Sequence, residues 1–299
     1  MKVAVAGASG LIGKPLVASL ESRGFEVARL VRTSPKDTSR EIEWHPDQGA
    51  IDAAGLEGTD AIMNLAGDGI ADGRWTEEKK RRIHDSRVNG TRLLSKTIAG
   101  LSRKPKTFIC ASAIGFYGER GNEWVDEKST SGKGFLADVC RDWEQATETA
   151  EAAGIRVVKL RLGVVLTKDG GIMASMLRPF KLGLGGKLGS GKQYLSWVTI
   201  EDTGAAFNFI LDHGELRGPI NVVAPHPATN EEFTKALGRV LSRPTFMAMP
   251  AFAARLVFGK EMANEMMLSS TRVAPKVLKD AGFKFQYPEI EGAVRAMLE

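Results

Sequence analysis

The sequence predicts an α/β fold, with a doubly wound parallel sheet followed by a smaller, mostly helical C-terminal lobe. Short apolar, β-prone segments alternate with helix-like segments through the first 224 residues. This alternation is typical of a parallel sheet with helices on both faces. Beyond residue 224 the alternation stops, and helix-like segments are separated by prolines. We therefore expect the sheet domain at residues 1–224 and the helical lobe at residues 225–299.

The first turn carries three glycines between a predicted strand, residues 2–6, and a predicted helix that stops at Gly24. Glycines there let the backbone approach a pyrophosphate, and the N–H groups of the helix start point at its charge. The arrangement predicts a Rossmann-type dinucleotide site; a tight packing turn without a ligand is the alternative. The residues expected to line the pyrophosphate are Gly7, Ser9, Gly10, Leu11 and Ile12.

The second predicted strand, residues 25–32, ends in Arg32 rather than in an acidic residue. Proteins that bind NAD usually carry Asp or Glu there for the ribose 2′-hydroxyl, whereas an arginine accommodates the 2′-phosphate of NADP. A guanidinium holds a phosphate through two parallel hydrogen bonds. The sequence therefore favours NADP over NAD, with an Arg32 that simply meets solvent as the alternative.

The later elements continue the alternation. Strands are expected at residues 61–67, 106–113, 156–166 and 219–223. Helices are expected at residues 77–99, 135–153 and 203–211. Strands that alternate with helices of this length predict a parallel, doubly wound sheet.

Composition places the chain among ordinary globular proteins, with 43% hydrophobic residues, 26% charged residues and a net charge of +5. No Lys/Arg run is dense enough for nucleic acid, and no apolar run has the length of a membrane span. The first strand begins at the N-terminus, which leaves no room for a signal peptide. We expect a cytoplasmic protein with a small-molecule partner, without metal, nucleic acid or membrane, as a monomer or a homodimer.

Five motifs occur in a characteristic order, with Ser112 followed by Tyr117 as the fourth of them. The other four are GASGLIG at 7–13, NLAG at 64–67, NGTRLL at 89–94 and WVTIED at 197–202. On these motifs the chain resembles the extended short-chain dehydrogenase/reductase superfamily, which includes nucleotide-sugar epimerases. Three further segments make it similar to an atypical, epimerase-like subfamily, often labelled as nucleotide-sugar epimerases or cell-division inhibitors. They are FLADVCRDWE at 135–144, RPFKLGLGG at 178–186 and AGFKFQYP at 281–288.

The resemblance implies a catalytic Tyr, a Lys four residues later and an upstream Ser or Thr that binds the same substrate oxygen. Ser112 matches the upstream hydroxyl. Phe135 stands at the expected Tyr position and Val139 at the expected Lys position, and neither side chain transfers a proton. Tyr117 is then the candidate acid, with a role in shaping the pocket as the alternative.

The resemblance also implies which further residues surround the cofactor. Asn64, Leu65 and Ala66 would pass under the adenosine and ribose. Arg87, on the long helix, would reach a phosphate or ribose, with a surface ion pair as the alternative. Val164, at the end of a central strand, would lie near the nicotinamide.

The substrate is expected to meet an insertion at about residues 167–197. Its glycine-rich loop carries Lys187, Gln193 and, at its end, Trp197, which suit an anionic or planar group. A glycine-rich lid without a charged partner is the alternative. The leading hypothesis is an NADP-binding epimerase-like or oxidoreductase-like protein that transfers hydride without the usual Tyr–Lys pair. Its rival is a non-catalytic NADP-binding sensor or protein-interaction module.

Overall fold

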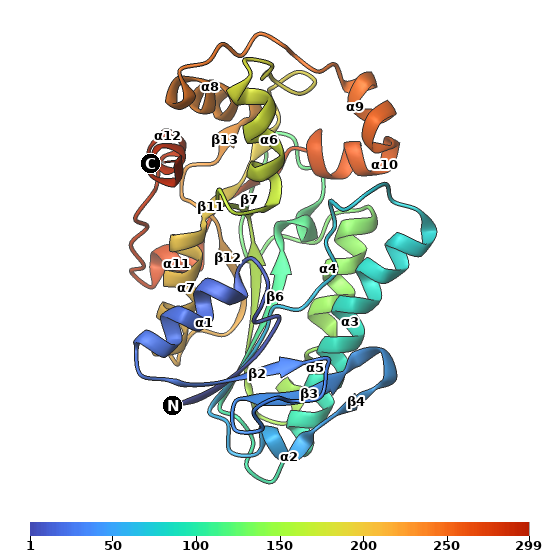
Figure 1. Cartoon of the computed structure of the whole chain (residues 1–299), viewed down its shortest axis with the longest axis vertical. Helices are drawn as coiled ribbons and strands as arrows, with labels where there is room; N and C mark the ends of the chain where they lie inside the picture. Colours follow the sequence, from blue (N-terminus) through green and yellow to red (C-terminus); the bar gives the residue numbers. More distant parts are fainter. Residues whose placement is uncertain (299) are drawn as a thin grey trace.

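A parallel sheet forms the centre of the molecule in the computed structural model, which describes residues 1–298 (Figure 1). The order of its eight strands is β12-β8-β6-β5-β1-β2-β3-β4, and only β3 and β4 are antiparallel. The chain moves outward from β1 through β2 and β3, then continues from β5 on the other side of β1. The strands are β1 Lys2–Ala6, β2 Glu26–Val31, β3 Glu41–His45, β4 Ala50–Ile51, β5 Ala61–Asn64, β6 Thr107–Ala113, β8 Arg156–Leu162 and β12 Gly218–Val222.

This strand order confirms the doubly wound sheet expected from the sequence. It places a topological switch point between β1 and β5, and ligands of such sheets bind in the crevice at the carboxyl ends of the strands there. The sheet interior is fully buried, as Val5, Ile62, Phe108 and Val158 illustrate with 0% exposure each.

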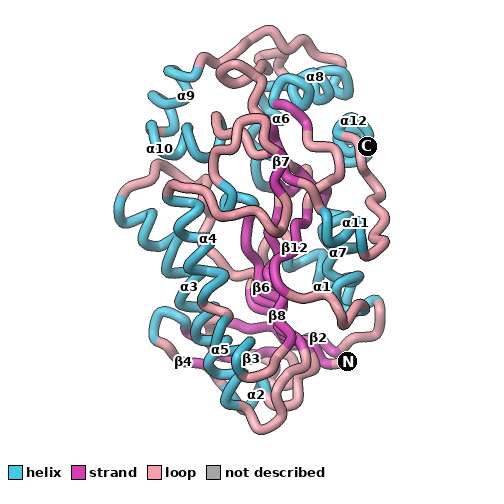
Figure 2. The backbone as a smooth tube through the Cα atoms, turned by 180° about the vertical axis from the view of Figure 1, so that it is seen from behind, coloured by secondary structure: helices cyan, strands magenta, loops and turns pink. Residues whose placement is uncertain are grey.

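Helices cover both faces of the sheet, and Figure 2 shows the same two layers from behind. One layer contains α3 Glu77–Gly100, α4 Phe135–Gln145 and α5 Glu148–Ala152. The other contains α1 Gly13–Ser22, α7 Ile200–Asp212 and α11 Lys276–Asp280. The short α2, Ala53–Leu56, and the 3₁₀ turns η1 Pro46–Gln48 and η2 Ile114–Tyr117 complete the connections.

A second hydrophobic core forms above the carboxyl edge of the sheet. It joins residues of the 164–197 segment, such as Phe180 and Trp197, to residues past 224, such as Phe233 and Val294. The helices there are α6 Gly171–Lys181, α8 Asn230–Leu241, α9 Ala251–Phe258, α10 Lys260–Met262, the π-helical turn η3 Ala263–Met267 and α12 Ile290–Leu298. Three two-stranded pairs connect them: β9 Val164–Leu166 with β11 Trp197–Thr199, β10 Tyr194–Leu195 with β13 Ala228–Thr229, and β7 Trp124–Val125 with β14 Arg272–Val273.

The strand expected at residues 156–166 is divided at Gly163 into β8 and β9. A Cβ at Gly163 would lie 2.8 Å from Val223 Cγ1 and 2.9 Å from the carbonyl oxygen of Ser196. The glycine lets the chain leave the main sheet and pair with β11 instead of β12. Among residues 1–298, no helix is both long and apolar enough to cross a bilayer.

Candidate functional site

The glycine-rich turn between β1 and α1 is shaped by contacts within the protein at two of its glycines. Gly7 has φ +77°, and a Cβ there would lie 2.8 Å from the carbonyl carbon of Leu65. A Cβ at Gly13 would overlap the carbonyl oxygen of Gly7. Gly10 differs, because its Cβ would meet only that carbonyl oxygen, at 3.2 Å, and the residue is exposed. Gly10 therefore leaves the outer side of the turn open.

The start of α1 presents backbone N–H groups on this open side of the turn. Within residues 1–298, the backbone N–H groups of Leu11 and Ile12 donate to no protein acceptor. The helix has no side-chain cap and no acidic residue in its first turn. Free N–H groups and the helix dipole together favour an anion at this position.

Arg32 lies just after β2, which pairs with β1 up to Leu30 opposite Ala6. Its side chain is exposed, and in the described part of the chain it forms no hydrogen bond or ion pair. Its guanidinium donors are therefore free beside the glycine-rich turn.

The segment after β5 is held firmly against β1 and α3. Leu65 donates its N–H to Ala6 O at 2.9 Å, and Asn64 Nδ2 donates to Thr91 Oγ1 at 2.8 Å. The side-chain amide oxygen of Asn64, Oδ1, accepts a hydrogen bond from the N–H of Ala66 at 3.2 Å. These bonds fix the backbone of Leu65 and Ala66 at the switch point of the sheet.

Arg87, on α3, contacts this segment, and within residues 1–298 it makes no ion pair. Its Nη1 donates to the carbonyl oxygens of Asp68 and Ile83, each at 3.0 Å, and its guanidinium lies 5.2 Å from the Trp143 ring centroid. Burial lowers the pKa of Arg87. The contacts assign Arg87 to holding the loop after β5, and a contact with cofactor stays a prediction.

Ser112 and Tyr117 were expected to face the substrate, but in the structure both hydroxyls belong to a buried hydrogen-bond network. Ser112 donates its hydroxyl to Glu144 Oε1 at 2.8 Å, and Tyr117 donates to Asn221 Oδ1 at 2.7 Å. Ser112 is 2% exposed and Tyr117 0%. Burial raises the pKa of Tyr117 to about 12. This geometry fits the structural alternative for Tyr117 better than a role as substrate acid.

The centre of the network is Arg161, on β8. Its Nε and Nη2 donate to the two carboxylate oxygens of Glu144 at 2.8 and 2.9 Å, and its Nη1 donates to the Tyr117 hydroxyl at 3.0 Å. The guanidinium lies 3.5 Å from the ring centroid of Phe116. Burial acts to lower the pKa of Arg161, but the hydrogen bonds and charge of Glu144 outweigh it, so the pKa is raised.

Glu127 lies on the other side of the network. Its raised pKa predicts that the free energy of unfolding depends on pH. Its Oε1 accepts from the N–H groups of Asn221 and Val277, and burial raises its pKa above the ordinary 4.5. A raised pKa means that the folded state binds this proton more tightly than the unfolded state does. Its contribution therefore favours folding at low pH and is lost as pH rises above 4.5 through the raised value.

Glu127→Gln keeps the oxygen that accepts both hydrogen bonds and removes the buried charge. We expect this variant to unfold at a higher urea concentration than the parent at neutral pH, because no buried carboxylate then has to ionise. The advantage should shrink as pH falls towards 4.5. Urea titrations at several pH values measure it; a constant difference between the two proteins would contradict the assignment.

The face of α4 that meets the end of β6 carries Leu136 and Cys140, not Phe135 and Val139 as expected. A Cβ at Gly115 would lie 3.3 Å from Leu136 Cβ and 3.7 Å from Cys140 Sγ. Phe135 instead packs edge-to-face on Trp75 at 5.1 Å, towards α3. The expected positions are one residue out, because the helix start could not be placed more finely from the sequence.

This face of α4 offers no proton donor of ordinary acidity. The helix, FLADVCRDWEQ, contains neither Tyr nor Lys. Burial raises the pKa of the Cys140 thiol to about 12. Any proton needed at the end of β6 has to come from elsewhere.

The three expected substrate residues are not brought together at one surface. Trp197 is 0% exposed in the second core, and its Nε1 donates to His226 O at 3.2 Å. Gln193 Nε2 donates to the carbonyl oxygens of Leu188 and Met267, which shapes the loop. Lys187 is the one whose charged group faces solvent, with its Nζ 3.7 Å from Glu231. Val164 lies in β9, paired with Trp197.

The contacts that join the helical lobe to the start of α4 were not predicted from the sequence. Glu265, in η3, accepts from the N–H groups of Phe135 and Leu136 at 3.0 and 2.8 Å, and so caps α4 from a distant segment. Gly134 has φ +112°, and a Cβ there would lie 2.8 Å from the Glu265 carboxylate. The only local signal is a helix that begins without a capping side chain.

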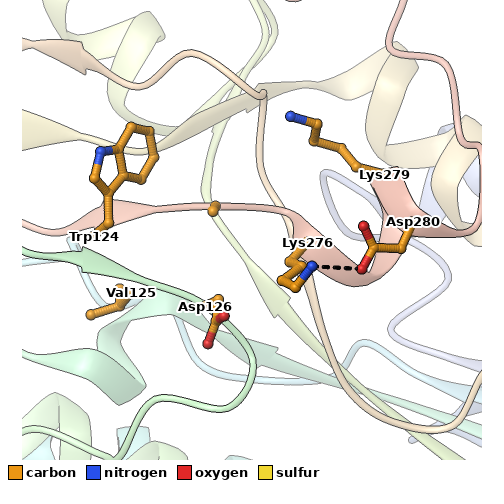
Figure 3. A pocket seen from close by; sticks show the side chains of 7 residues that line it. Trp124, Val125, Asp126, Lys276, Lys279 and Asp280 are labelled. Atoms are coloured by element: carbon orange, nitrogen blue, oxygen red, sulfur yellow. Dashed lines mark hydrogen bonds and ion pairs between the residues drawn. The ribbon is translucent and has the colours of Figure 1, made fainter.

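A separate pocket of about 270 Å³ lies between β7 and α11 (Figure 3). Trp124, Asp126 and Lys279 line it, together with a 2.8 Å ion pair between Lys276 and Asp280. It is lined by none of the residues expected from the sequence, so it is distinct from the glycine-rich turn after β1 and the segment after β5.

Known proteins resemble this chain over nearly its whole length. The sequence model described as "NAD dependent epimerase/dehydratase family" matches residues 3–223, and a "Domain of unknown function (DUF1731)" matches residues 249–297. The chain is 44% identical to epimerase family protein Mb2239 of Mycobacterium bovis, over 98% of this chain and 96% of that protein.

Two solved structures extend the comparison. The crystal structure of human epimerase family protein SDR39U1 (isoform 2) with NADPH is 34% identical and covers 99% of each chain, with a TM-score of 0.91. UDP-glucose 4-epimerase of Thermus thermophilus in complex with NAD is 18% identical, covers 100% of this chain and 98% of that one, and has a TM-score of 0.76, which shows a shared fold alone. The chain therefore belongs to the NAD dependent epimerase/dehydratase family.

Proposed function

We propose that this protein binds NADP at the glycine-rich turn and uses it for hydride transfer with a small carbonyl, hydroxyl or nucleotide-sugar substrate. The observation that carries the proposal is the open turn at Gly10, with the free N–H groups of Leu11 and Ile12, followed just after the next strand by the exposed guanidinium of Arg32, which has no protein partner within residues 1–298. The NADPH bound by the human relative, 34% identical over nearly the full chain, supports the same choice.

The chain's own residues would hold the cofactor in a defined order. Backbone groups of Gly7, Ser9, Gly10, Leu11 and Ile12 would bind the pyrophosphate, and Arg32 the 2′-phosphate. The fixed backbone of Leu65 and Ala66, behind Asn64, would support the adenosine and ribose. Arg87 keeps that backbone in place, and Val164 would border the nicotinamide.

The proton in this reaction would come from water. When bound, NADPH supplies the hydride to the substrate's carbonyl carbon, and the carbonyl oxygen then needs a proton to become a hydroxyl. The hydroxyls of Ser112 and Tyr117 donate to Glu144 and Asn221, so we propose that both residues support the end of β6 from the interior rather than contact the substrate. Lys187 would bind an anionic part of the substrate.

Arg32→Ala tests the cofactor assignment. We expect the parent protein to bind NADPH more tightly than NADH, and the variant to lose about 10- to 100-fold in NADPH affinity, the range of a charged hydrogen bond. NADH affinity should not change. Calorimetric titration of both cofactors measures this. Arg29→Ala is the matched control, because that arginine lies on the same strand and is paired with Glu21; equal NADPH and NADH binding by the parent would refute the phosphate argument.

The second candidate function is a sensor that binds NADP without turning it over. The specific observation in its favour is the lack of Tyr and Lys in α4. A screen of carbonyl compounds and nucleotide sugars for oxidation of bound NADPH separates the two. Turnover of any of them supports the enzyme, whereas tight binding without turnover favours the sensor.

A further inference from the structure

α9 and the loop before it lie at the end of the molecule remote from the N-terminus (Figure 1), and these segments carry several exposed large apolar side chains. Phe252 and Leu256 of α9 are 72% and 74% exposed, and Phe246, in the preceding loop, is 74% exposed. Surfaces of this kind on a monomer are uncommon and usually bind something. We call this set the α9 surface; it comprises Leu182, Leu184, Phe246, Met247, Phe252, Leu256 and Val257.

The segments that carry the α9 surface are joined into one structure. The N–H of Met247 donates to Gly185 O at 3.1 Å, and the N–H of Met249 donates to Lys187 O at 2.9 Å. α9 follows directly, and Phe252 and Leu256 share a helix face because they are one turn apart. Arg74 donates to Leu256 O and Val257 O, which ties the end of α9 to the sheet domain. The apolar side chains are therefore displayed on an ordered scaffold.

The same segments are strongly basic. No Asp or Glu occurs between Asp169 and Glu201, or between Glu232 and Glu261. The two stretches carry four and five Lys/Arg residues, respectively. Within residues 1–298, six of these are exposed and have no carboxylate partner: Arg178, Lys181, Lys192, Arg243, Arg255 and Lys260.

We propose that the α9 surface docks on an anionic membrane surface, as a peripheral contact. Apolar side chains that enter the boundary of the acyl chains, surrounded by cations that meet anionic headgroups, are the two components of interfacial binding. A second copy of this chain would bring like charges together. Nucleic acid would use the cations but would leave exposed Leu, Met and Val side chains without a partner. The proposal replaces the expectation of no membrane contact and does not depend on the cofactor assignment.

Co-sedimentation with lipid vesicles tests the proposal on the full-length protein. We expect it to sediment with vesicles of equal phosphatidylcholine and phosphatidylglycerol, far less with phosphatidylcholine alone, and less as salt rises. Lys181→Gln with Arg243→Gln should weaken binding about 25-fold, or about five-fold for each cation. Phe252→Gln with Leu256→Gln should weaken it at least about ten-fold, because two apolar side chains no longer leave water. All four side chains are exposed, and the single hydrogen bond lost is that from Arg243 Nε to Lys181 O at 2.9 Å; an unchanged circular dichroism spectrum checks that both variants are folded.

Two controls lie outside the α9 surface. Lys279→Gln removes an exposed cation of α11, and Trp124→Gln removes an exposed apolar side chain of β7; neither should change sedimentation. The proposal is overturned if the protein ignores anionic vesicles, or if the controls weaken binding as much as the paired variants. It is also overturned if light scattering shows a dimer that Phe252→Gln with Leu256→Gln dissociates while vesicle binding is absent.

Discussion

Glu144→Leu is expected to destabilise the protein by about 3–5 kcal/mol, the cost of leaving a buried charge without its partner. The side chain of Arg161 is 4% exposed and that of Glu144 is 10% exposed, so water cannot replace the lost carboxylate. The two hydrogen bonds that Glu144 accepts from Arg161 and the one it accepts from Ser112 would disappear together. Urea unfolding at neutral pH measures the loss.

A double variant shows whether the loss comes from the unpaired charge. Replacing both partners, Glu144→Leu with Arg161→Met, should cost less than Glu144→Leu alone, because neither charge is then buried. Asp138→Ala removes an exposed partner of Arg141 on the same helix and should change stability by about 0–1 kcal/mol. If Glu144→Leu lowers the free energy of unfolding by less than Asp138→Ala does, the buried network does not stabilise the fold.

Gly13→Ala and Gly10→Val should separate the two roles of the glycine-rich turn. The methyl group in Gly13→Ala would overlap the Gly7 carbonyl oxygen, so the turn must move. We expect a loss of about 1–3 kcal/mol in stability, as for other overpacked sites, together with the loss of NADPH binding. Gly10→Val should cost less stability than Gly13→Ala, since its Cβ would approach only the Gly7 carbonyl oxygen, at 3.2 Å, and the residue is exposed.

The effect of Gly10→Val on the cofactor is the decisive measurement. The added side chain would occupy the space that a pyrophosphate needs, so NADPH affinity should fall by about 100-fold or more, as when a close polar approach is blocked. Val31→Ala is a useful control, because it shortens a side chain at the end of β2 and adds nothing to the turn. NADPH binding that survives Gly10→Val would place the cofactor elsewhere.

The main elements of the fold could be predicted because each strand and helix has its own local pattern. The first turn is the strongest case, with its glycines between a short apolar strand and an amphipathic helix. Gly163 is the opposite case, since a glycine inside an apolar run does not say that the strand changes sheets. That depends on Ser196 and Val223, which come from distant parts of the chain.

The positions of the expected catalytic residues could not be predicted in the same way. Ser112 and Tyr117 have the right chemistry and spacing, but Glu144, Arg161 and Asn221 engage their hydroxyls in the interior. The face that a helix turns towards the sheet also changes when its position is misjudged by one residue. In α4 the residues towards the end of β6 are Leu136 and Cys140, each one position after Phe135 and Val139.

The alternating sheet, the glycine-rich turn and the arginine after the second strand could be read from the sequence, because all three depend on neighbouring residues. Which polar groups are free depends on packing between distant segments. Among residues 1–298, Arg32 and the N–H groups of Leu11 and Ile12 have no protein partner, whereas Tyr117 and Arg87 donate to Asn221 and Asp68 from other segments. Hydrogen-bond partners and burial are set by packing between distant segments, and a local pattern does not contain them.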